Sequence, residues 1–115
     1  MNGNNDTSTS TSERSEQRLP ALTAMQLKTC DDAVANLTKA GTLRTTSDRR
    51  IFEVDENAWV QTEAADKRLI LIGLACAIHR KQFDALTSDE FIWINGVYSG
   101  KRVARISSYG PNLDP

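Results

Sequence analysis

The sequence contains few of the residue types that form metal-binding and catalytic sites. It has one histidine, two cysteines and no CxxC pair, whereas structural zinc sites use four cysteine or histidine ligands. It also lacks a glycine-rich phosphate loop and a serine-centred nucleophile motif. We therefore expect no metal, no cofactor and no catalytic residue, and we expect that the protein is not an enzyme.

The nearest approach to a reactive pair is Cys76 and His79, with Cys30 as a third candidate ligand. Their spacing of three residues places Cys76 and His79 on one face of a helix. However, Cys76 belongs to an apolar segment, where burial disfavours the thiolate. His79 falls in the last turn of the expected helix, a position that the helix dipole favours for a basic residue. The sequence thus favours structural roles for both residues.

Long apolar segments and secretion signals are also missing. The longest apolar run, Leu69–Ile78, has ten residues, against roughly twenty for a membrane-spanning helix. The N-terminus has no basic region followed by an apolar stretch. Cys30 and Cys76 occupy apolar positions of expected helices, which favours reduced, buried thiols over a disulfide framework. These features predict a cytoplasmic protein that does not associate with a membrane.

An excess of positive charge is absent as well. The formal net charge is −1, and after removal of the first twenty residues the basic and acidic side chains are equal in number. A neutral body lacks the field that attracts a phosphate backbone, so the sequence disfavours a general nucleic-acid partner.

The strongest feature that is present is the apolar run Leu69–Ile78. Its charged flanks predict a helix over residues 63–81, with Thr62 as the N-cap. Apolar side chains point in every direction around this helix, so we expect it to be covered on more than one side, by a sheet and by another helix or a partner subunit. Gly73 in its interior suggests a close approach by a neighbouring group.

The segment that precedes this helix contains two expected elements. Residues 1–20 are polar and predict a disordered tail. Thr23 and Gln26 have the spacing of a capping box, so a helix should begin near Ala24 and end before Gly41. Two short strands, over residues 42–45 and 50–54, should then form a hairpin, and one helical turn should carry Trp59 to the core.

A second hairpin is expected near the C-terminus. Its turn could lie at Asn95-Gly96 or at Ser99-Gly100, and the second position leaves longer strands, over residues 91–98 and 101–107. A three-residue loop would then place four apolar side chains on one face, with Gly96 at a bulge or a close approach. These core-facing residues would be Ile92, Ile94, Ala104 and Ile106.

The expected fold is therefore α+β, in the order helix, β-hairpin, long buried central helix and C-terminal β-hairpin, with an antiparallel sheet packed on the helices. Residues 21–109 would form a single domain, flanked by the tail over residues 1–20 and a C-terminal tail over residues 110–115. The central helix needs two covers, while the chain offers it one sheet and one helix with a narrow apolar stripe. This shortfall suggests a partner.

The second face of the C-terminal hairpin is the first candidate binding surface. It would combine aromatic and basic side chains, with Arg105 lying over Trp93, and residues of these types are enriched at protein interfaces. The expected function is a small non-enzymatic interaction module that binds another protein or a second copy of itself. The candidate interface residues are Phe91, Trp93, Tyr98, Arg102 and Arg105.

The first hairpin suggests an alternative function. The end of the first helix, followed by a basic hairpin, resembles the recognition helix and β-wing of winged-helix DNA-binding domains. The resemblance implies that Arg44, Arg49 and Arg50 contact phosphate groups, as in a nucleic-acid-binding accessory protein. The chain departs from that family because only a polar tail precedes Thr23, which leaves no room for the two preceding helices.

Overall fold

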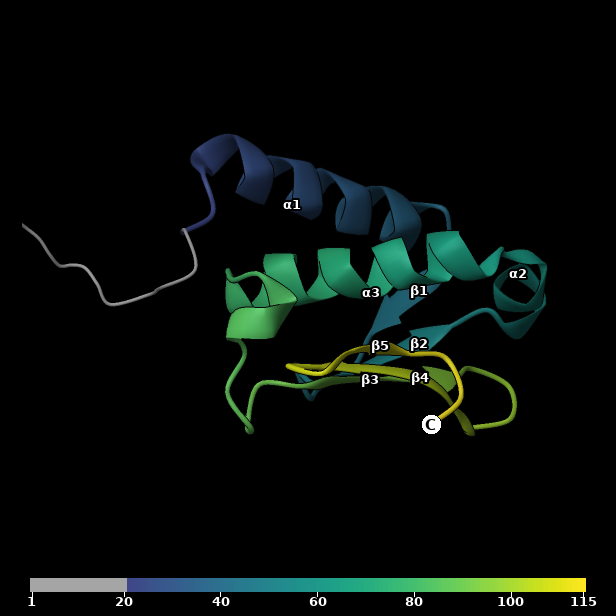
Figure 1. Ribbon diagram of the computed structural model, residues 1–115. Helices are drawn as coiled ribbons and strands as arrows, with labels where there is room; N and C mark the ends of the chain where they lie inside the picture. The colour runs from purple at the N-terminus through teal and green to yellow at the C-terminus, as the bar shows by residue number, and fades with distance from the viewer. Residues whose placement is uncertain (1–20) are drawn as a thin grey trace, which may run out of the picture.

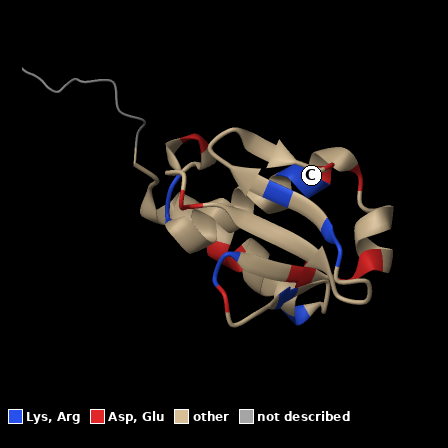
Figure 2. Ribbon diagram, turned by 90° about the horizontal axis from the view of Figure 1, so that it is seen from below, with Lys and Arg blue, Asp and Glu red and all other residues tan. Residues whose placement is uncertain are grey.

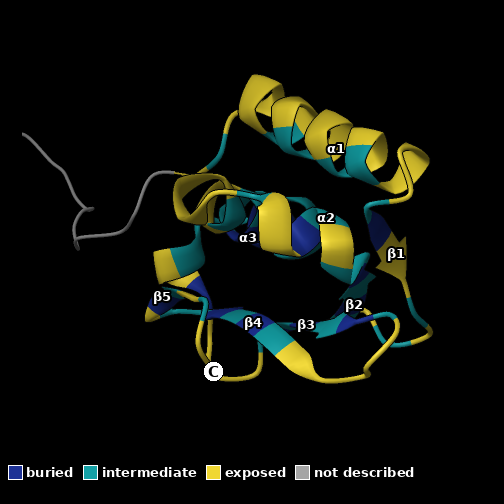
Figure 3. Cartoon of the chain, turned by 90° about the vertical axis from the view of Figure 1, so that its right-hand side faces the viewer, coloured by how far each residue is buried: buried dark blue, intermediate teal, exposed yellow. Residues whose placement is uncertain are grey.

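The computed structural model describes residues 21–115, and the expected tail over residues 1–20 lies outside this range. The elements form three layers. Helix α1 (Ala24–Lys39) lies on helix α3 (Ala64–His79), and α3 lies on a sheet (Figure 1). Figure 3 shows that burial is concentrated between α3 and the sheet, while the outer side of α1 is exposed. The expected α+β class is confirmed.

Helix α1 begins as its local sequence predicts. The backbone N–H of Gln26 donates to the Thr23 hydroxyl at 3.1 Å, and the backbone N–H of Thr23 donates to the Gln26 side-chain oxygen at 2.8 Å. This reciprocal pair satisfies two N–H groups that a helix start leaves free. The helix ends before Gly41, whose φ of 80° is a conformation that glycine adopts without strain.

The sheet has five strands in the order β1-β2-β3-β4-β5. Most neighbouring strands are antiparallel, but β2 pairs with β3 in parallel, so the prediction of an antiparallel sheet is wrong and the sheet is mixed. The bounds of the strands are β1 (Leu43–Thr45), β2 (Ile51–Val54), β3 (Ile92–Gly96), β4 (Arg102–Ser107) and β5 (Gly110–Asn112).

The parallel pair follows from what joins its two strands. Helix α2 (Glu56–Gln61), α3 and the 3₁₀ turn η1 (Phe83–Ala85) lie between β2 and β3 in the chain and carry it back across the sheet. A strand that follows such a crossover enters the sheet in the same direction as the one before it. Helix α2 also carries Trp59 into the core, where 5% of it is exposed, as expected.

The core lies between α3 and one face of the sheet. Leu71 and Leu74 of α3 are completely buried there. The four apolar residues expected on the inner face of the C-terminal hairpin are buried as well, and Ile92 pairs with Ile106 and Ile94 with Ala104. The pairing predicted for these four core positions is therefore confirmed. The predicted bounds of the first strand and the three-residue loop are wrong, because the pairing shifts between Ile94 and Asn95, β3 ends at Gly96 instead of Tyr98, and β4 begins at Arg102.

The sheet and α1 cover α3, as expected, but two details of this helix differ from the prediction. The N-cap is Glu63, because Thr62 ends α2 instead. A Cβ atom added at Gly73 would have no neighbour within 4 Å, so the expected close approach there is wrong. That close approach occurs at Gly96, where an added Cβ would overlap the Glu56 side chain.

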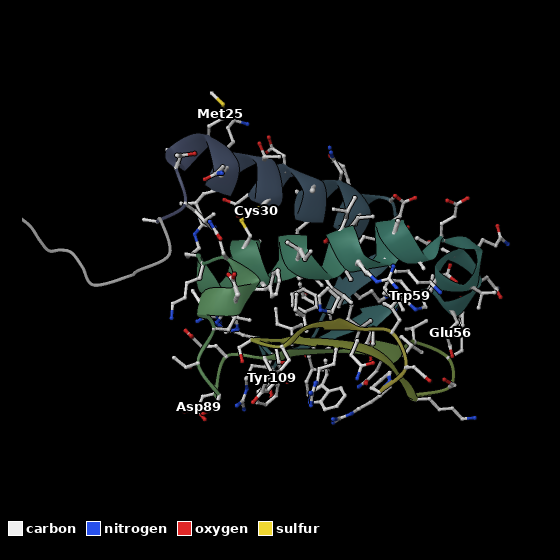
Figure 4. All side chains as sticks on the ribbon, in the orientation of Figure 1. Met25, Cys30, Glu56, Trp59, Asp89 and Tyr109 are labelled. Carbon is white, nitrogen blue, oxygen red and sulfur yellow. A yellow bond between two sulfur atoms is a disulfide. The ribbon has the colours of Figure 1, made fainter. Side chains whose placement is uncertain are left out.

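The two cysteines form a disulfide. Cys30 of α1 and Cys76 of α3 are joined, with their Cα atoms 6.0 Å apart, so the prediction of two reduced thiols is wrong. The cause is the packing of the two helices, which places the second turn of α1 beside the end of α3 (Figure 4). The sequence shows only that both positions are apolar, and a covalent tie is equally compatible with apolar positions.

The C-terminal segment also differs from the expectation. Residues 110–112 were expected to be a tail, but they pair with β4 as the short edge strand β5. Pro111 cannot donate to a ladder, and prolines within sheets are confined to edge strands, as here. In residues 21–115, no helix is long and apolar enough to cross a membrane.

Candidate binding surface

The sheet has one covered face and one open face. In the described part of the chain, the helices lie on a single side of the sheet, so the opposite face is open (Figures 1 and 2). Because successive side chains of a strand alternate between faces, the residues between the core positions of β3 and β4 point to the open face. Among them are Trp93, opposite Arg105, and Asn95, opposite Arg102.

The centre of the open face is Trp93 with two arginines. The guanidinium carbon of Arg102 lies 4.0 Å from the centre of a Trp93 ring, and that of Arg105 lies 5.2 Å from it. The expected contact of Arg105 with Trp93 across the hairpin is therefore confirmed. A guanidinium over an aromatic ring is favoured by about 0.5–1 kcal/mol at an exposed site, so the ring orients both cations.

Two further arginines come from β1 and from the turn before β2. Arg50, which precedes β2, stands at the edge of this face, where its guanidinium lies 5.2 Å from the centre of the Phe91 ring. Arg44 pairs with Glu53, which pairs in turn with Asn95, so Arg44 lies in the same row of the sheet. We refer to this surface as the arginine face and define it by Arg44, Arg50, Phe91, Trp93, Arg102 and Arg105.

The structure therefore unites most of the two candidate sets but excludes two residues. Arg49, an expected phosphate contact, donates instead from Nη2 to the carbonyl of Ile78 at 2.9 Å and thus satisfies a carbonyl at the end of α3. Tyr98 is 74% exposed and lies in the turn between β3 and β4, beyond the end of β3. Neither residue belongs to the arginine face.

Two polar atoms of this face lack partners. Oδ1 of Asn95 and Nε of Arg105 are shielded from solvent, and within residues 21–115 neither has a hydrogen-bond partner. A shielded polar atom without a partner carries a desolvation cost of about 1–3 kcal/mol. Because solvent does not reach either atom, a bound molecule could pair with them only after the side chains of this face move.

A shallow hollow adjoins the arginine face. It encloses about 260 Å³ beside Phe91 and Arg105, and the other lining residues are mainly hydroxyl-bearing. Tyr109 at its rim is 96% exposed (Figure 4). The hollow can accept one side chain of a bound molecule. The lining is completed by Thr87, Ser88, Ser107, Ser108 and Tyr109.

Sequence reasoning did not identify the carboxylates that hold the loops around this face. Oε1 of Glu56 accepts from the backbone N–H groups of Tyr98 at 2.7 Å and Ser99 at 3.0 Å. A hydrogen bond from the Ser99 side chain, together with these two backbone groups, lowers the pKa of Glu56. The same side chain is the one that approaches Gly96 closely. Tyr98 and Ser99 follow Glu56 in the sequence by 42 and 43 residues, so no local pattern reveals the contact.

Glu90 organises a second cluster, before β3. Its Oε1 accepts from Nζ of Lys81 at 2.6 Å and from the backbone N–H of Thr87 at 2.9 Å. These hydrogen bonds, first that from Lys81, lower the pKa of Glu90 to about 2. Nδ1 of His79 lies 3.9 Å from Oε2 of Glu90, while burial lowers the pKa of His79 and favours the neutral ring.

The Glu90 cluster predicts a pH dependence of stability. Because the pKa falls from 4.5 to about 2 on folding, the stabilisation is complete above pH 4.5 and is lost as the pH falls toward 2. The difference in unfolding free energy between the native protein and Glu90→Gln should therefore be largest at pH 7 and should shrink toward pH 2.

Urea titrations of both proteins at pH 7, 4 and 3 measure this difference. Asp84→Asn is the control, because Asp84 is an exposed acidic residue of the neighbouring 3₁₀ turn. A difference that stays constant from pH 7 to pH 3 would show that the Glu90 charge does not stabilise the fold.

The described residues do not form a recognisable catalytic or metal centre. Within residues 21–115, no group of three or more His, Cys, Asp or Glu side chains is arranged to hold a metal ion. Cys76 is in the disulfide, so in this state it offers no thiolate beside His79. Comparisons of the chain with protein-family models, with curated proteins and with solved structures give no match, so its function is inferred from the arginine face.

Proposed function

We propose that this protein is a non-enzymatic interaction module that binds an acidic protein segment through the arginine face. The observation that carries the proposal is the pair of guanidinium groups held over Trp93 on the open face of the sheet. Tryptophan and arginine are the residue types that most often dominate the binding energy of protein interfaces. Here Trp93, Arg102 and Arg105 lie together on β3 and β4, two strands that are anchored by the buried side chains of their other face.

Charge selects an acidic partner. The arginine face carries four guanidinium groups. Glu53 lies among them in the ladder, and Oδ1 of Asp48 lies 3.5 Å from Nε of Arg50, so the positive charge is concentrated at Arg102 and Arg105. Carboxylates form paired hydrogen bonds with guanidinium groups, and both groups keep their charge at neutral pH. Trp93 already orients Arg102 and Arg105, so these side chains lose less entropy on binding than freely rotating arginines would lose.

The same charge disfavours a second copy as the partner on this face. A symmetric dimer places the same patch of both subunits in contact, so that Arg102 and Arg105 of one copy would meet those of the other. Like charges in an interface are unfavourable. We therefore expect the chain to sediment as a monomer at micromolar concentration. If the chain instead forms a dimer that Trp93→Ala disrupts, a second copy is the partner that binds this face.

Single-stranded nucleic acid is the second candidate. The observation in its favour is that Arg44 and Arg50 of the first hairpin join the aromatic residues of the second hairpin on one face. Phosphate groups could bind the arginines, and bases could stack on an aromatic ring. Against it, both arginines beside Trp93 already lie over its ring, and base stacking would have to displace them.

The test compares two probes of equal charge. An extended peptide of alternating glutamate and valine and an oligothymidylate are titrated into the ¹⁵N-labelled full chain, and binding is followed by amide chemical shifts. The proposal predicts shifts in β3 and β4 with the peptide and an affinity at least tenfold lower for Arg102→Ala/Arg105→Ala, since one hot-spot residue typically contributes more than 1 kcal/mol.

The control variant replaces an arginine that lies outside the arginine face. Arg68→Ala removes an exposed arginine on α3, away from the sheet, and should bind the peptide as the native chain does. Tighter binding of oligothymidylate than of the peptide, with a steep salt dependence, would favour the nucleic-acid candidate. Equal losses in the double variant and in Arg68→Ala would reject the arginine face as the site.

A further inference from the structure

We propose that the Cys30–Cys76 disulfide is a redox latch that holds α1 on α3, and that a dithiol reductant releases this helix while the rest of the domain stays folded. The first observation is the shallow burial of α1, which has no fully buried residue. Its apolar stripe contributes Val34 and Leu37, which are only partly buried against the core. Noncovalent contacts therefore hold α1 less firmly than they hold the other layers.

The latch and a hinge lie at opposite ends of α1. Cys30 belongs to the second turn of the helix, and the disulfide joins it to the last turns of α3 (Figure 4). At the other end, Gly41 has a φ of 80°, and an added Cβ would have no neighbour within 4 Å. A helix with a glycine at one end and a covalent tie near the other can swing out when the tie opens.

The polar contacts that would hold α1 on α3 without the tie are weak. Asp31 and Arg80 form an ion pair at 2.7 Å, but both side chains are about half exposed, at 47% and 48%. Exposed ion pairs contribute only about 0–1 kcal/mol. The capping box of Thr23 and Gln26 stabilises the helix itself and not its packing on α3.

A reductant can reach the disulfide. Both cysteines line an open groove of about 590 Å³ between α1, α3 and η1, together with apolar residues that include Met25, Ile72 and Phe83. Cys30 is partly exposed, whereas Cys76 is 4% exposed. Attack therefore occurs at Sγ of Cys30, because this is the sulfur that solvent reaches more readily.

The reaction balances as a two-electron exchange. A thiolate of the dithiol bonds to Sγ of Cys30, the Cys30–Cys76 bond breaks, and Cys76 leaves as a thiolate that takes a proton. The second thiol of the reductant then displaces Cys30, which leaves two cysteine thiols and the cyclic disulfide of the reductant. Release of α1 exposes more of the α3 surface around Ile72, which lines the groove between the two helices.

Hydrogen exchange of the full chain tests the latch. Amides of residues 24–39 should exchange at least tenfold faster in dithiothreitol than in the oxidised protein. In dithiothreitol their free energy of opening should also be lower than that of the β3 and β4 amides, whose exchange requires unfolding of the domain. Cys30→Ser/Cys76→Ser should show the fast pattern without reductant and should not respond to dithiothreitol. Removal of the reductant and reoxidation of the native chain should restore slow exchange in α1.

Two results would overturn the proposal. If α1 keeps its protection in dithiothreitol after thiol labelling has shown that the disulfide is reduced, noncovalent packing alone holds the helix. If the amides of α1 and those of β3 and β4 have the same free energy of opening in dithiothreitol, α1 opens only when the whole domain unfolds and no separate latch exists. Both results come from the native chain, so neither depends on whether the serine variant folds.

Discussion

The variant Cys30→Ala/Cys76→Ala should have a free energy of unfolding about 4 kcal/mol lower than that of the oxidised native protein. The disulfide joins residues separated by 46 positions, and a loop of this length loses chain entropy in the unfolded state equivalent to about 4 kcal/mol at 25 °C. Urea denaturation followed by tryptophan fluorescence measures the change, because Trp59 is buried in the core.

The native chain in dithiothreitol is the matched control for this variant. It should unfold at the same urea concentration as the alanine variant, since both lack the tie and differ only in two sulfur atoms. A loss below about 1 kcal/mol in both proteins would mean that the unfolded reduced chain keeps the segments of α1 and α3 close together, so that the tie removes little chain entropy from the unfolded state.

The variant Leu74→Ala should lose about 2–5 kcal/mol of unfolding free energy. Leu74 is completely buried between α3 and the sheet, and its truncation removes apolar contacts and leaves a cavity. Leu69→Ala is the matched control, because it makes the same substitution in the same helix at a side chain that is 65% exposed. Its expected loss is within about 0.5 kcal/mol.

The pair of leucine variants tests the orientation of α3. Equal losses at both positions would mean that the helix is rotated relative to the sheet, or that Leu69 is buried by a partner subunit. The second cause is distinguishable by sedimentation, since only a dimer would sediment faster. Both variants keep the helix propensity, because leucine and alanine are both good helix formers.

The elements that the sequence could predict are those that depend on neighbouring residues. The capping box at Thr23 and Gln26 involves positions three apart, and the structure forms it as expected. The inner face of the C-terminal hairpin follows from alternation along two adjacent strands, and Ile92 and Ile94 are buried there. Local hydrogen bonds and side-chain periodicity determine both features, so no knowledge of the tertiary fold is needed.

The features that sequence reasoning missed depend on contacts between distant segments. The parallel pairing of Ile51 with Trp93 requires the crossover through α3, and periodicity within either strand does not specify a neighbour. The disulfide requires α1 to lie along α3 with Cys30 beside Cys76. The short strand β5 contains glycine and proline, residue types that are depleted in strands.

The disulfide removes one of the arguments for a cytoplasmic location. Two reduced cysteines favoured the cytoplasm, whereas persistent disulfides are typical of oxidising compartments. The cysteines therefore no longer support a cytoplasmic location.

The candidate surface was predictable in its composition but not in its extent. The contact of Arg105 with Trp93 follows from the register of one hairpin and is confirmed. The parallel pairing adds Arg44 and Arg50 from the other hairpin, which makes one surface of two separate candidates. Arg49 could not be separated from Arg50 by sequence, because only the position of the α3 C-terminus shows that Arg49 bonds to it.

The parallel pairing of β2 with β3 also sets the order in which the chain can fold. The pairs β1–β2, β3–β4 and β4–β5 are antiparallel and join strands that follow one another in sequence, so each can form from a short loop. The pair β2–β3 closes the longest connection in the sheet and has to await the docking of α3. Because loop closure precedes the gain from such contacts, we expect this step to limit the folding rate. Substitutions that weaken α3 packing before this step should slow folding more than substitutions in the β4–β5 pair.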